Sequence, residues 1–217
     1  AQALGLYYSA FSLPAGGKLF IYNTDGTKII GAFTGFNNKN GGLFATEPLP
    51  DDEIILEYVQ PAGLKAQPEI IISEISYIYR WFDNSGAYQK GFGSSGSCEL
   101  NVNCFPEGND WQDEKRGIVR ILFKYKKGSG WCSGSLVNNT REDGTPYLLS
   151  ADHCMDGASL EDLEQWVFYF NYESPYCTNP PSVPSYSMTG ASLAANSGGN
   201  FYTASDFLLL QLDTSIP

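Results

Sequence analysis

The chain has 217 residues, a net charge of −11 at pH 7, 17% charged residues and 14% aromatic residues. This acidity argues against nucleic acid as a partner, because phosphate groups bind to basic protein faces. No apolar run approaches the roughly 20 residues that a membrane-spanning helix needs, so we expect no membrane insertion. Short apolar runs separated by Gly, Asn, Asp and Pro clusters predict an all-β protein instead.

The first 82 residues predict an antiparallel β-sandwich that serves as a pro-domain or accessory domain. Expected strands cover residues 18–22 and 28–33, on either side of a turn that contains Gly26, and then residues 42–46, 53–59 and 69–79. Its aromatic residues are interpreted as core rather than as a carbohydrate-stacking surface; they are Tyr7, Tyr8, Phe11 and Tyr22.

Residues 83–97 are rich in Gly and Ser and predict a linker. Lys90-Gly91 is a candidate processing site within it, and an uncut tether is the alternative. Residues 98–217 form a second predicted region. Its expected elements are strands at 117–125, 134–137, 146–150, 166–172 and 206–212, a helix of about two turns at 159–166, and surface loops over 172–204.

The only histidine is His153, in the stretch LLSADHC. Cys132 begins one predicted strand and Cys154 follows the next. If these strands are antiparallel neighbours, a Cys132–Cys154 disulfide would fix the backbone beside His153 and contribute about 3 kcal/mol. Asp206 precedes an apolar run, where a carboxylate needs a partner such as a histidine N–H. These neighbours favour a catalytic base over a structural histidine.

Three motifs in the same order resemble the trypsin-like, chymotrypsin-fold serine peptidases. CSGSLV from Cys132 is similar to their C-G-G-S-L-I, SADHC from Ser150 to T-A-A-H-C, and DFLLLQL from Asp206 to D-I-x-L-L-x-L. The bacterial secreted lysyl endopeptidases look closer still, with further similar segments at 97–104, 106–108, 116–120, 134–140 and 170–172. The resemblance covers roughly residues 91–217. Residues 1–82 are more weakly similar to the sandwich segments that precede such domains.

This resemblance implies the first β-barrel of a two-barrel enzyme that cleaves protein or peptide substrates without a cofactor, outside the cytoplasm. His153 would be the base and Asp206 its orienting partner. It also implies the bridges Cys132–Cys154 and Cys104–Cys177, with Cys98 paired to the second barrel. That barrel, with the nucleophilic serine, is expected to be missing from this chain, which would then be inactive alone. Lysine specificity is a family-level expectation.

Other serines fit the nucleophile poorly: Ser197 precedes Asp206 in a polar loop, and Ser135 matches a strand serine of the family. Asp152 departs from the Ala or His that the family commonly has beside the histidine, and we expect this departure to have only a surface effect.

Two alternatives stay open. One is a Cys₃His zinc centre of His153, Cys132, Cys154 and Cys177, although no C-x-x-C pair is present. The other is a non-enzymatic, protease-like module, whose first region would act as a binding domain or as a pro-segment.

Overall fold

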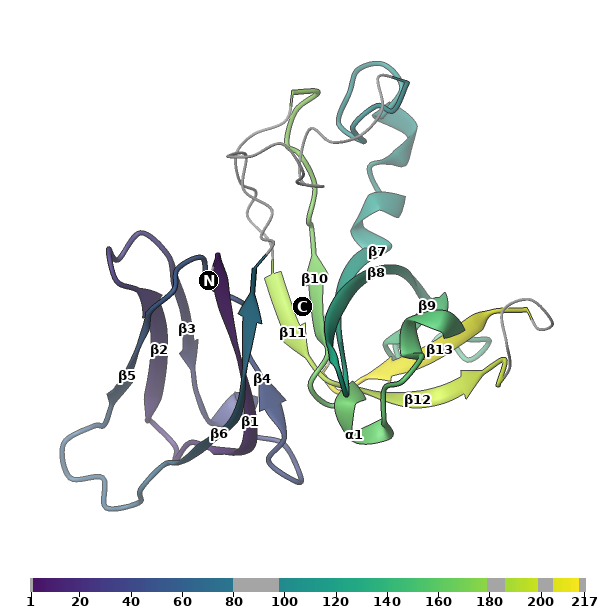
Figure 1. Cartoon of the computed structure of the whole chain (residues 1–217). Helices are drawn as coiled ribbons and strands as arrows, with labels where there is room; N and C mark the ends of the chain where they lie inside the picture. The colour runs from purple at the N-terminus through teal and green to yellow at the C-terminus, as the bar shows by residue number, and fades with distance from the viewer. Residues whose placement is uncertain (1, 80–97, 179–185, 199–204, 215–217) are drawn as a thin grey trace. The chain divides into compact units, whose positions relative to one another are not determined.

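Strands make up most of the regular structure in the computed structural model, which describes residues 2–79, 98–178, 186–198 and 205–214 (Figure 1). The all-β fold expected from the composition is confirmed. The chain divides into two compact units, Ala1–Trp81 and Phe82–Pro217. The candidate processing site Lys90-Gly91 and the linker around it lie outside the described residues. Within the described ranges, no helix is both long and apolar enough to cross a membrane.

The first unit is built from two three-stranded antiparallel sheets. One sheet has the order β4-β1-β6 and the other the order β3-β2-β5. The strands are β1 (Ala3–Ser12), β2 (Lys18–Asn23), β3 (Ile29–Phe33), β4 (Phe44–Ala45), β5 (Ile54–Val59) and β6 (Glu69–Ile78), with a 3₁₀ turn η1 at Gly35–Asn37. Side chains alternate along β2, where Leu19, Ile21 and Asn23 are buried, as expected for a strand with one covered face.

Aromatic side chains fill the core between these two sheets. Phe11 stacks on Phe44 with ring centroids 4.4 Å apart, and Tyr8 contacts the edge of Phe11 at 5.3 Å. Tyr7, Tyr8 and Phe11 are buried and Tyr22 is half-buried, so this aromatic cluster packs the interior.

The second unit contains one seven-stranded antiparallel sheet, in the order β11-β10-β7-β8-β9-β13-β12. The strands are β7 (Ile118–Tyr125), β8 (Gly128–Val137), β9 (Tyr147–Ala151), β10 (Val167–Phe170), β11 (Tyr186–Thr189), β12 (Ala191–Asn196) and β13 (Phe207–Leu212). The short helical elements are η2 (Asn109–Trp111), η3 (Glu114–Gly117), η4 (Asp152–Met155) and α1 (Leu160–Leu163). Apolar side chains from these strands, together with Trp166 just before β10, form one core that includes Phe168, Leu148 and Leu208.

This sheet curls until its two ends meet. The end strands β11 and β12 are separated in the chain by Gly190 alone, whose N–H donates to the Trp166 carbonyl and whose carbonyl accepts from the Asp213 N–H. The ladder therefore continues round the bend, as the curl of the green and yellow strands in Figure 1 shows. The expected barrel is present as a curled, seven-stranded half-barrel around the core.

Three expectations for the second unit need correction. The stretch 172–204 is not all loop, since it contains β11 and β12. β12 is rich in Ala and Ser, and pairing with β13 holds it, not its own β-propensity. β8 begins at Gly128, not at Gly134. The glycines in its first half obscure the strand in the sequence, but they fit the packing, since a Cβ on Gly130 would lie 2.5 Å from the Phe123 ring. α1 is a single turn, capped by the Ser159 side chain, and not two turns.

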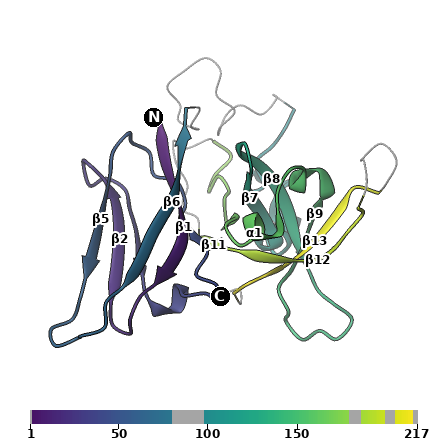
Figure 2. The ribbon, with the colours of Figure 1, turned by 60° about the horizontal axis from the view of Figure 1, so that its bottom comes forward.

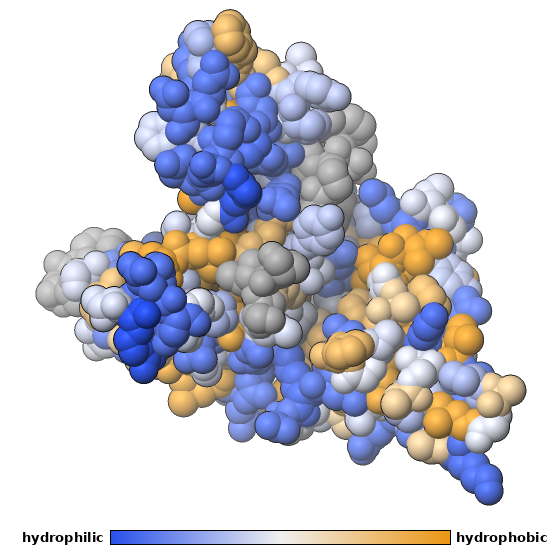
Figure 3. Space-filling view, turned by 180° about the vertical axis from the view of Figure 1, so that it is seen from behind, coloured by the Kyte–Doolittle hydropathy of each residue, from blue (hydrophilic) through white to orange (hydrophobic). Residues whose placement is uncertain are grey.

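Apolar side chains also reach the surface of the first unit. Ile71, Ile75 and Tyr77 of β6 are 51%, 61% and 64% exposed. On the face shown in Figure 3, orange hydrophobic patches interrupt the hydrophilic blue surface.

Candidate active site

The strand β9 and the start of β13 bring His153 and Asp206 to the same end of the barrel. Ala151, the last residue of β9, pairs with Phe207, the first residue of β13. The chain turns into η4 immediately after Ala151, and His153 is the second residue of that turn. The strands β9 and β13 run side by side (Figure 2). Since paired antiparallel strands keep these positions together, residues separated by 53 positions in sequence become neighbours.

His153 and Asp206 form two hydrogen bonds with each other. The ring nitrogen Nδ1 of His153 lies 2.8 Å from Oδ2 of Asp206, and the backbone N–H of His153 donates to Oδ1 at 2.9 Å. The carboxylate thus binds both the ring and the backbone of one residue. This double attachment fixes the orientation of the imidazole relative to the barrel.

The backbone of Asp206 is held in an uncommon conformation. Its φ is +51°, in the left-handed region, which costs a residue with a Cβ about 1–2 kcal/mol. The Asp206 carbonyl accepts a hydrogen bond from the Asp152 N–H at 3.1 Å, and its carboxylate accepts from His153. Asp and Asn tolerate this conformation better than most residues, which fits an aspartate here.

The hydrogen bond from the His153 side chain, followed by that from the His153 backbone, lowers the pKa of the Asp206 carboxyl below its usual range. The folded state therefore favours the carboxylate. The stabilisation that this pair contributes is present at neutral pH and is lost as the pH falls through the folded-state pKa of Asp206.

The pair can act as an oriented base. Because Asp206 is a carboxylate and can only accept, Nδ1 carries the hydrogen in the neutral ring, and Nε2 is then the basic nitrogen. The His153 side chain is 53% exposed and that of Asp206 is 27% exposed. An exposed imidazole backed by a less exposed carboxylate is suited to accept a proton from a group that approaches from outside the barrel.

Two disulfides lie in the second unit. Cys132 of β8 is bonded to Cys154, which directly follows His153 and is buried in the core, with the two Cα atoms 6.3 Å apart. Cys104 is bonded to Cys177, with Cα atoms 4.5 Å apart. Among the residues described, Cys98 is the free cysteine, and it is exposed.

The zinc alternative requires the thiolates of Cys132 and Cys154 together with the His153 ring. Ligand atoms of Cys132, His153 and Cys154 lie within 4.8 Å of one another. Zinc binds thiolates, however, and both cysteines are joined to each other in the disulfide. Cys177, the fourth expected ligand, is bonded to Cys104. The oxidised protein therefore has no thiolate to offer from these four residues.

Three serine hydroxyls of this unit are hydrogen-bonded to other groups. Ser150 donates to the Ser133 carbonyl at 2.8 Å, Ser135 lies against the Leu136 carbonyl at 3.3 Å, and Ser197 donates to the Asp152 carboxylate at 2.8 Å. None of these three hydroxyls is hydrogen-bonded to His153 in the described part of the chain.

The expectation that Asp152 has only a surface effect is wrong. Asp152 is only 8% exposed, and its carboxylate accepts hydrogen bonds from Asn196 Nδ2 at 2.9 Å and from Ser197. Sequence reasoning identifies Asp152 as a departure from the family pattern but not these partners, which lie more than 40 residues away.

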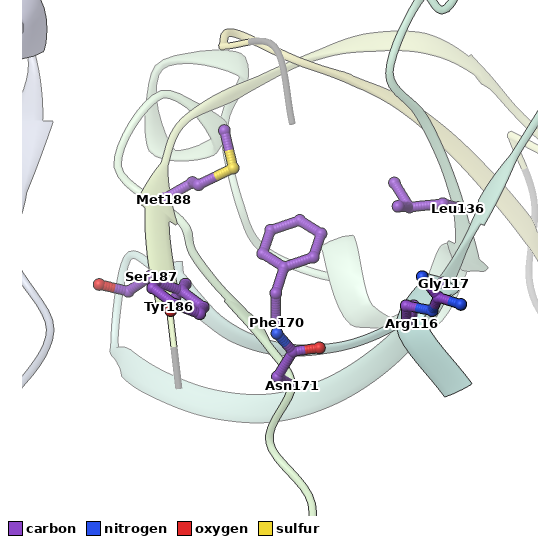
Figure 4. A pocket seen from close by; sticks show the side chains of 8 residues that line it. All are labelled: Arg116, Gly117, Leu136, Phe170, Asn171, Tyr186, Ser187 and Met188. Atoms are coloured by element: carbon purple, nitrogen blue, oxygen red, sulfur yellow. The ribbon is translucent and has the colours of Figure 1, made fainter. Parts of the chain in front are cut away.

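A separate hollow of about 700 Å³ opens where β7 and β11 begin. It is lined by Arg116, Gly117, Leu136, Phe170, Asn171, Tyr186, Ser187 and Met188. Figure 4 shows the Phe170 ring pointing into the space between Met188 and Leu136. The hollow shares no residue with the His153–Asp206 pair.

An antiparallel barrel that carries a hydrogen-bonded histidine and aspartate fits the trypsin-like class of serine peptidases. Residues 92–217 match the family "Lysyl endopeptidase, C-terminal domain", and the chain belongs to this family. The lysyl endopeptidase of Pseudomonas aeruginosa is 26% identical over 150 residues, which are 67% of this chain and 32% of that protein. The chain thus spans about a third of the length of this curated relative.

Proposed function

We propose that this chain contributes the base and its orienting carboxylate to a serine endopeptidase. The observation that carries the proposal is the His153–Asp206 pair, with Nδ1 at 2.8 Å from Oδ2 and the His153 N–H at 2.9 Å from Oδ1. Membership of the lysyl endopeptidase family supports peptide bonds as the substrate and suggests cleavage next to lysine.

In the proposed reaction, Nε2 of His153 takes the proton of a serine hydroxyl as that oxygen attacks the peptide carbonyl. The imidazolium that forms is stabilised by the negative charge of Asp206, and it then gives the proton to the leaving amine. The nucleophile, the oxyanion hole and the pocket for the substrate side chain would come from a part of the protein outside the described residues. By this proposal the 217 residues alone hydrolyse no peptide.

Cys98 fits a covalent link to that other part. It is exposed and free, whereas the four other cysteines are already bonded in pairs. We expect it to form a disulfide with a second barrel. Two further disulfides favour an oxidising compartment, so the protein is proposed to be secreted, at the cell surface or periplasmic. Processing at Lys90-Gly91 belongs to the same proposal.

The test uses the longest natural form of the protein and a chromogenic peptidyl-lysine substrate. Asp206→Asn is the sharpest variant, because asparagine tolerates the left-handed backbone but places an amide where the carboxylate accepts from Nδ1. We expect kcat to fall on the order of 10⁴-fold, the loss that the same change causes in a trypsin-like triad, where the histidine then adopts the wrong tautomer. His153→Ala should lose at least as much.

The control is Asp156→Ala, which removes an exposed acid from the residue that follows η4. It should leave kcat within about twofold, because an exposed charge contributes little. Hydrolysis that survives both Asp206→Asn and His153→Ala would contradict the proposal. A natural form of 23.8 kDa with a free thiol and no activity would favour the non-enzymatic module instead.

A further inference from the structure

The Asp152 carboxylate is buried beside the catalytic pair without touching the histidine ring in any hydrogen bond described above. It accepts from Asn196 Nδ2 at 2.9 Å through Oδ1 and from Ser197 Oγ at 2.8 Å through Oδ2. Burying a carboxylate costs free energy unless polar partners compensate, and these two hydrogen bonds supply that compensation.

Its two partners, Asn196 and Ser197, belong to the segment that is hydrogen-bonded to the start of β13. Asn196 is the last residue of β12 and pairs with Leu208 of β13. The Ser197 N–H donates to the Phe207 carbonyl at 2.9 Å. Phe207 directly follows Asp206, so the Asp152 carboxylate is connected to Asp206 through one side chain and one backbone hydrogen bond.

A second connection runs through the backbone of Asp152 itself. Its N–H donates to the Asp206 carbonyl at 3.1 Å, and the next residue, His153, donates its N–H to Oδ1 of Asp206 at 2.9 Å. Because the Asp152 carboxylate is fixed by its two hydrogen bonds, the backbone of Asp152 can move only a little. The left-handed φ of +51° at Asp206 is thus held between two segments that Asp152 joins.

We infer that Asp152 is a positioning residue: by tying the end of β12 to η4, it holds the Asp206 carboxylate against Nδ1 of His153. Asp152 acts through hydrogen bonds and not through its charge. The geometric part of this inference is independent of the proposed function, and only its consequence for catalysis rests on that function.

Two substitutions separate the hydrogen bonds from the charge. Asp152→Ala removes both hydrogen bonds and the charge. Asp152→Asn removes the charge alone, because the amide oxygen can accept from Asn196 while the amide N–H donates to the Ser197 hydroxyl, which can also accept. Asp156→Ala removes a neighbouring exposed acid that makes no such bonds, and serves as the matched control.

The readout is the tautomer of the neutral His153 ring, measured by ¹⁵N NMR at alkaline pH on the 217-residue chain. His153 is the only histidine, so one ring gives all the imidazole signals. In the unsubstituted chain we expect the Nδ1–H tautomer to dominate. Asp152→Ala should shift the tautomer ratio toward Nε2–H by about threefold to tenfold, the range that one hydrogen bond supports. Asp152→Asn and Asp156→Ala should keep the original ratio.

A folded Asp152→Ala with the original tautomer ratio would overturn the inference, and so would an Asp152→Asn as altered as the alanine variant, since the charge would then be responsible. If Asp152→Ala does not fold, Asn196→Ala and Ser197→Ala each remove one hydrogen bond; a shift in either supports the inference, and no shift in both overturns it. If the unsubstituted ring is not Nδ1–H, the proposed function fails at its carrying observation, which is a distinct result.

Discussion

The disulfide beside His153 allows a quantitative test of how the barrel is stabilised. Replacing Cys132 and Cys154 together with alanine opens a loop with a sequence separation of 22, and the chain-entropy relation gives a loss of about 3.4 kcal/mol. The same change at Cys104 and Cys177 opens a loop of 73 and gives about 4.4 kcal/mol. Removing the buried sulfur of Cys154 adds a small cavity cost to the first value.

Urea unfolding followed by tryptophan fluorescence measures both losses. Trp166 is fully buried in the barrel core and reports its unfolding. With an m-value of about 2 kcal/mol/M, each double variant should lower the urea midpoint by about 2 M. Cys98→Ala is the control, because this exposed cysteine closes no loop in the described residues, and its midpoint should stay unchanged.

The two bridges should differ in their effect on the active site. Cys154 follows His153 directly, so the Cys132/Cys154 variant should alter the imidazole NMR signal even while the barrel remains folded. The Cys104/Cys177 variant should leave that signal unchanged. The loop-closure reasoning is refuted if either double variant loses less than about 1 kcal/mol, or if opening the longer loop costs clearly less than opening the shorter one.

Three further predictions concern single side chains. Burial raises the pKa of Glu47 to about 7, so the folded first unit keeps a proton that the unfolded chain releases. The stability of this unit should therefore fall by up to about 3 kcal/mol as the pH rises from about 4.5 through 7. Glu47→Gln should remove most of that loss, measured by urea unfolding at pH 5 and pH 8. Lys124 Nζ lies 3.1 Å from the largely buried Asp162 carboxylate and also donates to Gln165 Oε1. Lys124→Met should cost about 3 kcal/mol, because it removes the counter-ion of Asp162, which keeps only its hydrogen bonds from Ser159, and Lys124→Met/Asp162→Asn should recover part of it in the same unfolding assay. A Cβ on Gly134 would lie 2.9 Å from a backbone carbonyl of β9, so Gly134→Ala should lower the barrel's unfolding free energy by about 1–3 kcal/mol, and an unchanged thermal midpoint would contradict this.

The strands that sequence predicts well are those whose apolar residues encode them locally. β5, β7 and β13 carry runs of Ile, Val, Leu and Phe, and their observed bounds lie within a residue or so of the expected ones. The histidine and aspartate are recognisable as candidates because they lie in motifs beside apolar strands, with His153 after β9 and Asp206 before β13. Antiparallel pairing of β9 with β13 then makes them neighbours.

What sequence does not predict depends on partners that are distant along the chain. β12 has the small residues of a loop and becomes a strand because β13 offers it a ladder. The first half of β8 is rich in glycine, which lowers β-propensity, yet Gly130 is needed where the Phe123 ring crosses it. The burial of Asp152 requires Asn196 and Ser197, and no local pattern around residue 152 specifies either.

The way in which β11 and β12 meet at Gly190 has a consequence for behaviour at high concentration. The end strands β11 and β12 adjoin through Gly190, whose N–H and carbonyl are both hydrogen-bonded, and this limits the open backbone on which a second molecule could template a strand. Each sheet of the first unit also ends in two outer strands, and one of these, β6, carries exposed Ile71 and Ile75. We expect self-association and fibril formation to start from β6, and the barrel to remain soluble when it is produced without the first unit.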